Sequence, residues 1–378
     1  MVDRRRIVRQ WRQASAKVLA TLVRVEGSSY RRPGAHLLIG AQGEYAGTIS
    51  GGCLEAEVVR KAKWMVRDGA RVRRYSTMFD DTAEMPFGLG CGGVVDLLLE
   101  PAQTPECQAF LAAMEASLSG TESLVATWLP QDGKDLARAV VCDGEVVFTS
   151  DGLDAAEIAL VSVTDNCLSS GLLEERIYVE KMRAPQRLFV LGAGDDAKPV
   201  VAMAALLGWN VTVADGRPQL ARSERFPEAQ RVLTASSVED LGIKCGDAVV
   251  LMTHSYEQDR ALLAGLLKVD SAAGTRPGYI GLLGARHRSS LLVSEAATML
   301  GRGVAECCER IYSPVGLDLG GDGAEAIALA VVAEVQAWVQ GRLGRSRRLT
   351  AEDVAEQVAQ GGASRYLQTQ CALGAAGS

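Results

Sequence analysis

The sequence predicts an α/β protein in which an N-terminal α+β domain over residues 1–181 precedes a domain with a parallel sheet over residues 182–345. Three observations predict this organisation. The first hundred residues read as β-branched strands in hairpin order, with helices near the N-terminus and after about Cys53. From Arg187 onward, apolar strands alternate with apolar helices, which is the pattern of a parallel sheet. The segment Arg183-Ala-Pro-Gln186 separates the two patterns, and we expect a tail with a short helix over residues 346–378.

Size and charge narrow the class of protein. The chain has 378 residues, 48% of them hydrophobic, which is enough to bury the cores of two domains. Its net charge of −6 disfavours non-specific binding to nucleic acid, which needs a broad basic surface. No stretch approaches the roughly 20 apolar residues of a membrane span. Nine cysteines without a Cys-x-x-Cys pair fit neither a disulfide framework nor a zinc ribbon, so we expect reduced thiols in a cytoplasmic protein.

The first domain is expected to begin with a helix over residues 3–14 and a strand over residues 17–26. The loop Gly27-Ser-Ser-Tyr-Arg-Arg-Pro-Gly34 follows. Its side chains Arg31 and Arg32 can form a fork for a phosphate or a carboxylate. A solvated turn explains the same residues.

A hairpin over residues 36–49 leads to the turn Ser50-Gly51-Gly52-Cys53, after which we expect a helix to begin at about Cys53. Unpaired N–H groups and the helix dipole stabilise a thiolate at such a position and lower the thiol pKa. The same N–H groups can hold a phosphate, which makes Ser50, Gly51 and Gly52 candidate cofactor-binding residues. The alternative is that Cys53 is a small buried hydrophobic residue.

A second thiol lies in the glycine-rich segment Gly88-Leu-Gly-Cys91-Gly-Gly93, between strands expected at residues 71–75 and 94–99. Glycine allows a backbone to approach a ligand closely, and it also allows tight strand packing. Residues 101–181 contain a helix and a hairpin at Asp143-Gly144. We expect them to complete the first domain's sheet, and they show no catalytic constellation.

The second domain opens with a dinucleotide-binding pattern. A strand over residues 187–191 leads into Gly192-Ala-Gly194, a helix follows, and a second strand ends at Asp215, twenty-one positions after Gly194. In this pattern the glycines form the turn, the helix start holds a pyrophosphate, and the acid binds a ribose hydroxyl. The sequence therefore predicts a Rossmann-like fold, although Asp195 and Asp196 place negative charge where the pyrophosphate would lie.

Polar residues follow the later strands of this domain. Because the carboxyl ends of parallel strands converge on one crevice, His254, Arg286, His287 and Arg288 are expected to line the same mouth as Gly192 and Asp215. A solvated rim explains the arginines equally well. A last apolar helix is expected over residues 323–340.

These motifs resemble the XdhC/CoxI family, accessory proteins of molybdenum hydroxylases such as xanthine dehydrogenase. In the first domain the resemblance rests on the loop at residues 27–35, on Ile49-Ser-Gly-Gly-Cys-Leu-Glu55 and on Gly90-Cys-Gly-Gly93. In the second it rests on Leu191-Gly-Ala-Gly194, Val213-Ala-Asp-Gly-Arg217, Met252-Thr-His254 and Ser313-Pro-Val-Gly-Leu-Asp318.

The resemblance implies a chaperone that binds the molybdenum cofactor, either as molybdopterin or as its dinucleotide, supports its sulfuration and delivers it to an apo molybdenum hydroxylase. A cysteine desulfurase is an implied partner, and a homodimer is the implied assembly. Cys53 would be the metal ligand or sulfur relay, with Cys91 as second candidate. The further residues implied to bind the cofactor are Arg31, Arg32, Gly192, Gly194, Asp215, Arg217 and Arg286, and the arginines among them would hold its anionic parts.

Two other functions fit parts of the sequence. A NAD(P)-dependent oxidoreductase would use the Rossmann-like domain with His254 as acid or base and a cysteine near the substrate. A nucleotide-sensing scaffold without bound metal would use the same domain. Because no proton-relay pair is identifiable at a fixed spacing, we expect a cofactor-insertion chaperone rather than a turnover enzyme.

Overall fold

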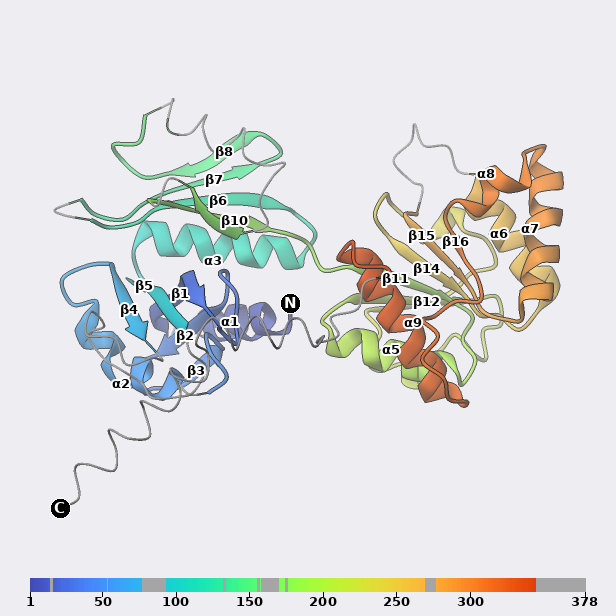
Figure 1. The fold of residues 1–378 in the computed structure, drawn as a ribbon, viewed down its shortest axis with the longest axis horizontal. Coiled ribbons are helices and arrows are strands. Elements are labelled where there is room, and N and C mark those ends of the chain that lie inside the picture. The colour runs from blue at the N-terminus through green and yellow to red at the C-terminus, as the bar shows by residue number, and fades with distance from the viewer. Residues whose placement is uncertain are drawn as a thin grey trace, which may run out of the picture. The chain divides into compact units, whose positions relative to one another are not determined.

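The computed structural model describes residues 1–13, 16–52, 54–76, 93–131, 134–154, 157, 170–173, 176–268 and 277–344. The chain forms two compact units, Met1–Ala184 and Pro185–Ser346 (Figure 1). The expected tail over residues 346–378 lies outside the described residues. Within the described part of the chain, no helix is long and apolar enough to cross a membrane.

The N-terminal unit begins with an antiparallel sheet of order β3-β2-β1-β5-β4. Its strands are β1 (Ala16–Gly27), β2 (His36–Gly40), β3 (Tyr45–Gly47), β4 (Arg71–Ser76) and β5 (Gly93–Pro101). Helix α2 (Glu55–Met65) packs Val58, Ala62 and Met65 against one face. Helix α1 (Val2–Arg12) packs Ile7 against Leu38 in a separate cluster.

Residues 101–182 do not complete this sheet, contrary to expectation. They form a second antiparallel sheet of order β8-β7-β6-β10-β9. Its strands are β6 (Ser123–Trp128), β7 (Ala137–Cys142), β8 (Glu145–Thr149), β9 (Ser170–Leu173) and β10 (Ile177–Met182). The reason is helix α3 (Pro105–Leu118), which lies between the two sheets (Figure 1). Its Phe110 belongs to one cluster with residues of both sheets. A helix inserted after β5 buries its apolar face on the second sheet and separates it from the first.

The C-terminal unit is a parallel sheet of order β13-β12-β11-β14-β15-β16. Its strands are β11 (Arg187–Leu191), β12 (Asn210–Asp215), β13 (Arg231–Thr234), β14 (Ala248–Leu251), β15 (Tyr279–Leu282) and β16 (Ile311–Tyr312). The strand order reverses between β11 and β14, which is the topological switch point of a Rossmann-like sheet. The predicted Rossmann-like fold is therefore confirmed.

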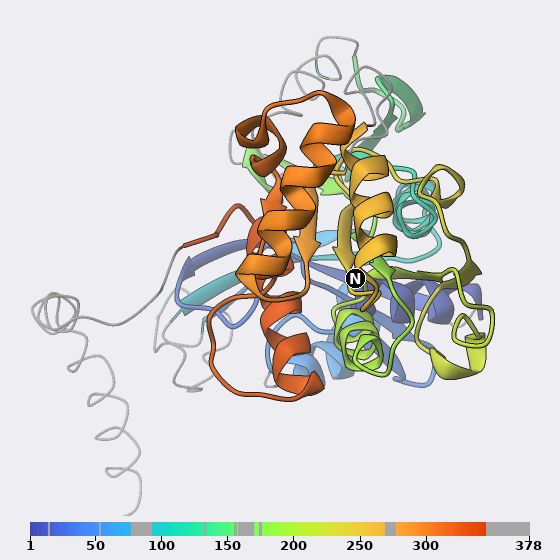
Figure 2. The same ribbon diagram turned by 90° about the vertical axis from the view of Figure 1, so that its right-hand side faces the viewer.

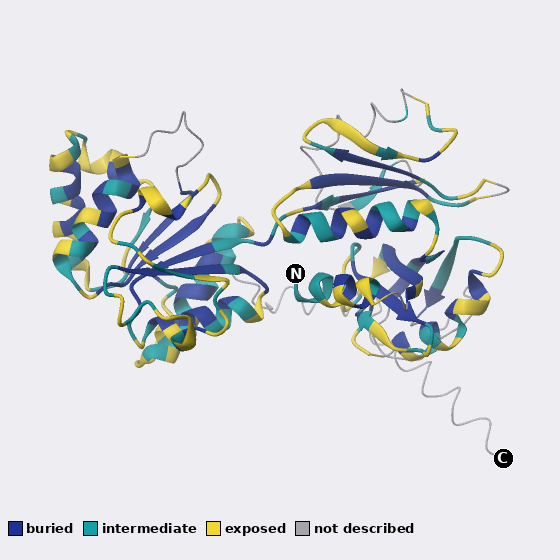
Figure 3. Cartoon of the chain, turned by 180° about the vertical axis from the view of Figure 1, so that it is seen from behind, coloured by how far each residue is buried: buried dark blue, intermediate teal, exposed yellow. Residues whose placement is uncertain are grey.

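Helices cover both faces of the parallel sheet. One face carries α5 (Ala197–Leu206) and α9 (Ala324–Val339), and the other carries α6 (Tyr256–Lys268) and α7 (Arg286–Leu300), followed by the short α8 (Val304–Cys308). Helices α6 and α7 lie side by side (Figure 2). The strands between the layers are buried, whereas exposed residues gather on the outer sides of the helices (Figure 3).

A buried network joins the two sheets of the N-terminal unit. His36 of β2 lies 3.1 Å from a carboxylate oxygen of Glu180 in β10, and the Arg4 guanidinium lies 3.2 Å from the same oxygen. Burial raises the pKa of Glu180, but the charges and hydrogen bonds of His36 and Arg4 outweigh burial and lower it. Because the folded-state pKa lies below the unfolded one, the carboxylate stabilises the fold above the unfolded pKa, and this contribution is lost as the pH falls through the folded pKa.

We predict that Glu180→Gln lowers the free energy of unfolding at pH 7 by about 3 kcal/mol, because it removes the buried carboxylate that His36 and the partly buried Arg4 contact. The variant should also lose part of the acid-induced destabilisation that the wild type shows below about pH 4.3. Urea unfolding from pH 7 to pH 3 measures both effects. Glu145→Gln, at an exposed position of β8, is the control and should keep the wild-type pH profile. Equal pH profiles for Glu180→Gln and the wild type would contradict the assignment.

Candidate functional site

Three loops of the N-terminal unit meet at one end of its first sheet. Strand β1 ends at Gly27 opposite Gly93, where β5 begins, and β4 ends at Ser76 opposite Val94. The segment that contains Cys91 therefore starts and finishes at this end. The loop from β1 to β2 and the turn from β3 to α2 leave the sheet at the same end. Cys53 and Cys91 themselves lie outside the described residues.

A buried carboxylate organises the turn that precedes Cys53. One oxygen of Glu55 accepts the N–H groups of Ile49 and Ser50 at 3.0 and 2.9 Å, and the other accepts the N–H of Gly52 at 3.1 Å. The Ser50 hydroxyl also donates to Glu55 and accepts the N–H of Leu54 at 3.0 Å. Glu55 is only 2% exposed. Burial raises its pKa, but these hydrogen bonds outweigh burial and lower it, so the group stays ionised.

This arrangement corrects two expectations. Helix α2 begins at Glu55 rather than at Cys53. The N–H groups of Ser50 and Gly52, which we expected to hold a phosphate, already donate to Glu55. The anion that fits this turn is therefore supplied by the chain itself. The sequence signal was the acid three residues after Gly52, which resembles the acid of a capping box.

The arginine loop contacts the same turn. Tyr30 is 75% exposed, and its ring lies 3.4 Å from where a Cβ on Gly51 would be. The two arginines do not form a joint fork. Arg31 makes an ion pair with Asp3 of α1 at 3.0 Å, whereas Arg32 is exposed. Of the predicted residues, the structure thus brings Arg31, Arg32, Gly51 and their neighbours together at one end of the sheet.

The glycine turn of the C-terminal unit lies at the switch point, as the sequence predicts. A Cβ on Gly192 would lie 2.3 Å from the carbonyl oxygen of Met252, so only glycine allows this approach between the turn and the end of β14. Above the turn, a carboxylate oxygen of Asp196 lies 2.4 Å from where a Cβ on Gly194 would be. The other oxygen lies 2.8 Å from Nε2 of His254, a residue with a left-handed φ of 60°.

These contacts change what the start of α5, where a pyrophosphate was expected, presents to a ligand. The pair of Asp196 and His254 lies over Gly194, and His254 is 61% exposed at the side chain. Asp195 makes ion pairs with Arg225 at 2.9 Å and with Lys198 at 2.8 Å. Its pKa is lowered by hydrogen bonds from Lys198 and Arg225. Two carboxylates thus occupy the start of α5, where an incoming pyrophosphate would meet negative charge.

Asp215, the expected ribose ligand, is fully engaged within the protein. Its oxygens accept the Ala193 N–H at 2.8 Å, the Arg217 N–H at 2.8 Å, and the Arg217 guanidinium through Nε at 2.9 Å and Nη2 at 2.8 Å. Burial raises the Asp215 pKa, but these partners outweigh burial and lower it. These four donors use the acceptor positions of Asp215, and its side chain has no exposed surface, so a ribose hydroxyl would have to displace one of them.

The neighbouring crevice is almost filled. A cavity of about 20 Å³ lies beside Asp215, Ser236, Thr253 and Gln258. This is roughly the space of one water molecule, whereas an adenosine would need a pocket of hundreds of Å³. The Ser236 hydroxyl lies 2.7 Å from where a Cβ on Gly216 would be, so the side chains after β12 and β13 close this side.

The basic residues at the start of α7 separate into two kinds. Arg286 and His287 are exposed, as a rim position predicts. Arg288 instead donates to buried Asp259 of α6 at 2.7 Å, and Asp259 also accepts the hydroxyl of Thr253 at 2.7 Å. This network ties α6, α7 and the end of β14 together. Sequence reasoning missed Asp259, although an acid in the first turn of a helix is a recognisable cap-type signal.

Within the described ranges, no group of three histidine, cysteine or acidic side chains is placed to hold a metal ion. The expected metal ligand, Cys53, lies outside those ranges, as does Cys91. Among the described residues beside the turn, the guanidinium groups of Arg31 and Arg32 carry the charge that fits the phosphate of a molybdopterin.

Comparison with known proteins agrees with the two-unit structure. Residues 10–76 match the XdhC and CoxI family, and residues 188–335 match the XdhC Rossmann domain. A protein of Bacillus subtilis described as a probable subunit of xanthine dehydrogenase is 28% identical, over 84% of this chain and 92% of its own length. The molybdenum cofactor insertion chaperone PaoD of Escherichia coli is 26% identical, over 84% of this chain and 82% of its own length.

A solved structure matches along nearly the whole chain. The crystal structure described as a xanthine dehydrogenase from Bacillus halodurans is 26% identical and superposes with a TM-score of 0.76. The match covers 94% of this chain and 99% of the other. The order of both units is therefore common to the two proteins.

We predict that Glu55→Gln opens the turn before Cys53, because an amide NH₂ would face N–H donors in place of one carboxylate oxygen. The change should lower the free energy of unfolding by about 2 kcal/mol. The amide protons of Ile49, Ser50 and Gly52 should exchange at least tenfold faster, which hydrogen–deuterium exchange measures. Glu57→Gln is the matched control, since Glu57 pairs with Arg60 and Lys61 on the same helix. Unchanged exchange in Glu55→Gln would refute the organising role of Glu55.

Proposed function

Because this chain belongs to the XdhC and CoxI family, we propose that it binds the molybdenum cofactor, supports its sulfuration and delivers it to a molybdenum hydroxylase of the xanthine dehydrogenase type. The names of two relatives support this, since one is described as a probable part of xanthine dehydrogenase and the other as a molybdenum cofactor insertion chaperone. Each of these matches spans both units of the chain.

The observation that carries the proposal is the turn held by Glu55. It fixes the backbone on both sides of Cys53, from Ile49 to Leu54, at the sheet end where the Cys91 segment also begins and finishes. When bound, the molybdenum cofactor supplies the metal centre at which an oxo ligand is replaced by sulfur. Cys53 would act there as a soft thiolate ligand or as a sulfur relay, with Cys91 as second candidate.

The partners follow from this role. The client is an apo molybdenum hydroxylase, and a cysteine desulfurase would deliver the sulfur. We propose a homodimer as the working assembly. A protein that hands over a cofactor must release it, so its side chains should bind the cofactor without enclosing it. The exposed Tyr30 and Arg32 beside the Cys53 turn suit an open site of this kind.

We predict that Cys53→Ala purified after co-expression with the cofactor pathway retains at least tenfold less molybdopterin than the wild type, because a ligand next to the metal is lost. Fluorescence of the oxidised pterin measures the retained amount. Cys245→Ala, which removes an exposed cysteine of the C-terminal unit, is the control and should retain the wild-type amount. Cys91→Ala separates the two candidate thiols. Wild-type retention by Cys53→Ala would exclude the proposed role of that thiol.

The second candidate, a NAD(P)-dependent oxidoreductase, has one favourable observation. His254 and Asp196 form a polar pair at the mouth of a Rossmann-like sheet, where an acid or base could act. The full engagement of Asp215 and the cavity of about 20 Å³ oppose it.

We predict that NADH and NADPH bind no tighter than about 1 mM, because the start of α5 carries two carboxylates and the ribose acid is engaged. A fluorescence titration measures this. The double variant Asp195→Asn with Asp196→Asn tests the cause, since removal of the two charges should increase any residual binding. Saturable micromolar binding by the wild type would favour the oxidoreductase.

A further inference from the structure

The loop between β1 and β2, which we call the β1–β2 loop, touches the chain next to both candidate thiol segments. A Cβ on Gly93, the last residue of the second glycine-rich segment, would overlap the carbonyl oxygen of Ser28, so the start of the loop packs directly on this glycine. Further along the loop, the ring of Tyr30 lies against Gly51, which stands two residues before Cys53 in the chain. A ligand held by this loop therefore lies at the sheet end from which both segments leave.

The ring of Tyr30 has one face on the glycine turn and the other in solvent. Its Cγ, Cδ1 and Cδ2 atoms lie 3.4, 3.5 and 3.6 Å from where a Cβ on Gly51 would be. Three such similar distances place that point over the ring face rather than beyond the ring edge. Tyr30 is nevertheless 75% exposed, and no described residue other than the chain neighbours lies within 4 Å of a Cβ on Gly52. The outer face of the ring can therefore stack a flat heterocycle.

Arg32 supplies positive charge two residues after Tyr30. Its backbone is fixed by the turn over residues 32–35, in which the Ala35 N–H donates to the Arg32 carbonyl at 3.2 Å. The φ of Gly34 is 91°, as in a type II turn, and the Gly34 N–H donates to the Leu22 carbonyl of β1 at 2.9 Å. The Arg32 side chain is exposed and makes no hydrogen bond or ion pair with another described residue. The loop thus presents a guanidinium that is available to a phosphate.

The neighbouring Arg31 has a different role. Its guanidinium makes an ion pair with Asp3 at 3.0 Å and so ties the β1–β2 loop to α1. The N–H groups of the turn before Cys53 cannot replace Arg32 as an anion site, because they donate to Glu55. Among the described charged groups of the loop, Arg32 is therefore the one without a partner in the protein.

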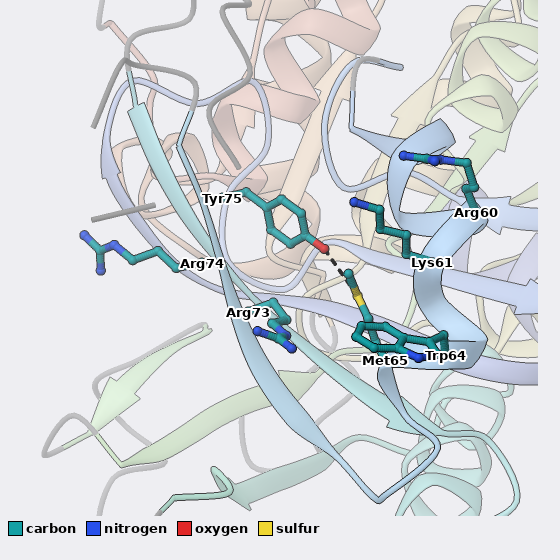
Figure 4. Close-up of a pocket in the computed structure, with 7 residues that line it drawn as sticks. All are labelled: Arg60, Lys61, Trp64, Met65, Arg73, Arg74 and Tyr75. Atoms are coloured by element: carbon teal, nitrogen blue, oxygen red, sulfur yellow. Dashed lines mark hydrogen bonds between the residues drawn. The ribbon is translucent and has the colours of Figure 1, made fainter. Parts of the chain in front are cut away.

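A second group of basic side chains lies in a pocket of about 530 Å³ between α2 and β4 (Figure 4). Its charge is balanced within the protein. Arg60 and Lys61 make ion pairs with Glu57, and Arg74 makes one with Glu26. A phosphate in this pocket would have to compete with these carboxylates, which favours the β1–β2 loop as the anion site.

We propose that the β1–β2 loop binds the molybdenum cofactor, with the pterin ring stacked on the outer face of Tyr30 and the phosphate held by Arg32. The assignment rests on the proposed function and adds which side chain holds which part of the cofactor. Arg31 is a positioning residue that fixes the loop on α1. Because the loop packs on Gly51 and Gly93, the cofactor lies beside the start of both candidate thiol segments.

The test uses the full chain and two fluorescent probes. The first is the oxidised pterin derived from molybdopterin, which keeps the phosphate but has no metal, and the second is the same pterin after phosphatase treatment. Fluorescence polarisation should show about tenfold tighter binding of the phosphorylated probe. Tyr30→Ala should weaken the binding of both probes about tenfold, because stacking is lost, whereas Tyr30→Phe should keep most of the affinity. Arg32→Gln should weaken only the phosphorylated probe, by about tenfold, because a charge-assisted hydrogen bond is lost.

Matched variants test the specificity of these effects. Tyr45→Ala removes another exposed tyrosine of the same sheet, in β3, and should leave both affinities unchanged. Arg31→Gln should bind the phosphorylated probe within about threefold of the wild type, because the ion pair that it removes is partly exposed and adds little stability. A loss of affinity in Arg31→Gln as large as that in Arg32→Gln would overturn the division of roles between the two arginines.

Retention of molybdopterin after co-expression distinguishes failure of this proposal from failure of the proposed function. A wild-type chain that retains no molybdopterin would contradict the function itself. If the wild type retains it, but Tyr30→Ala and Arg32→Gln retain as much and bind the probes as tightly, the function stands and the role of the loop is overturned. Wild-type protein without saturable probe binding would also overturn that role. Equal affinity for adenosine monophosphate and the phosphorylated probe would overturn the assignment to a pterin.

Discussion

The buried carboxylate of Glu55 is the constraint on which the candidate site depends. A turn with several N–H groups directed inward needs an anion, and in many proteins a bound phosphate supplies it. Here the first residue of the following helix supplies it, so the turn is already shaped before any ligand arrives. The consequence for binding is direct. An anionic ligand at this turn would have to be held by side chains, because the N–H groups of Ser50 and Gly52 already donate to Glu55.

In the C-terminal unit, as in the turn of Glu55, groups of the chain itself occupy the positions where a ligand was expected. Its sheet has the order and the glycine turn of a dinucleotide-binding fold, yet the groups that would hold a dinucleotide bind each other. Arg217 and the Ala193 N–H occupy Asp215, and His254 pairs with Asp196 above the turn. A fold gives the position of a site, but the chemistry belongs to the side chains. In this chain the fold alone therefore gives no reason to assign hydride transfer.

The parallel sheet was predictable from sequence because its signals are local. Gly192, Gly194 and Asp215 stand at fixed spacings around a strand and a helix, and the expected last helix over residues 323–340 agrees closely with α9. The second antiparallel sheet was not predictable, because it depends on α3 lying between distant strands. The partners of Asp215 and Asp196 could not be predicted either. A carboxylate that binds a ribose and a carboxylate that binds an arginine can stand at the same position in the sequence. Glu55 was visible in the motif, but its role depends on backbone directions that a sequence does not give.

One buried ion pair and one buried contact between a histidine and a carboxylate hold the first sheet of the N-terminal unit against the second. Arg138 of β7 makes two hydrogen bonds to Glu100 of β5 at 2.9 and 3.0 Å, and His36 of β2 meets Glu180 of β10. Each pair has one member in each sheet. Buried pairs add little net stability, but a mismatched arrangement would leave a buried charge unpaired at a cost of about 3–5 kcal/mol. The pairs therefore select one packing of the two sheets. Since β2 and β5 begin where the three loops meet, the same charges that join the sheets also fix the strands from which the candidate site is built.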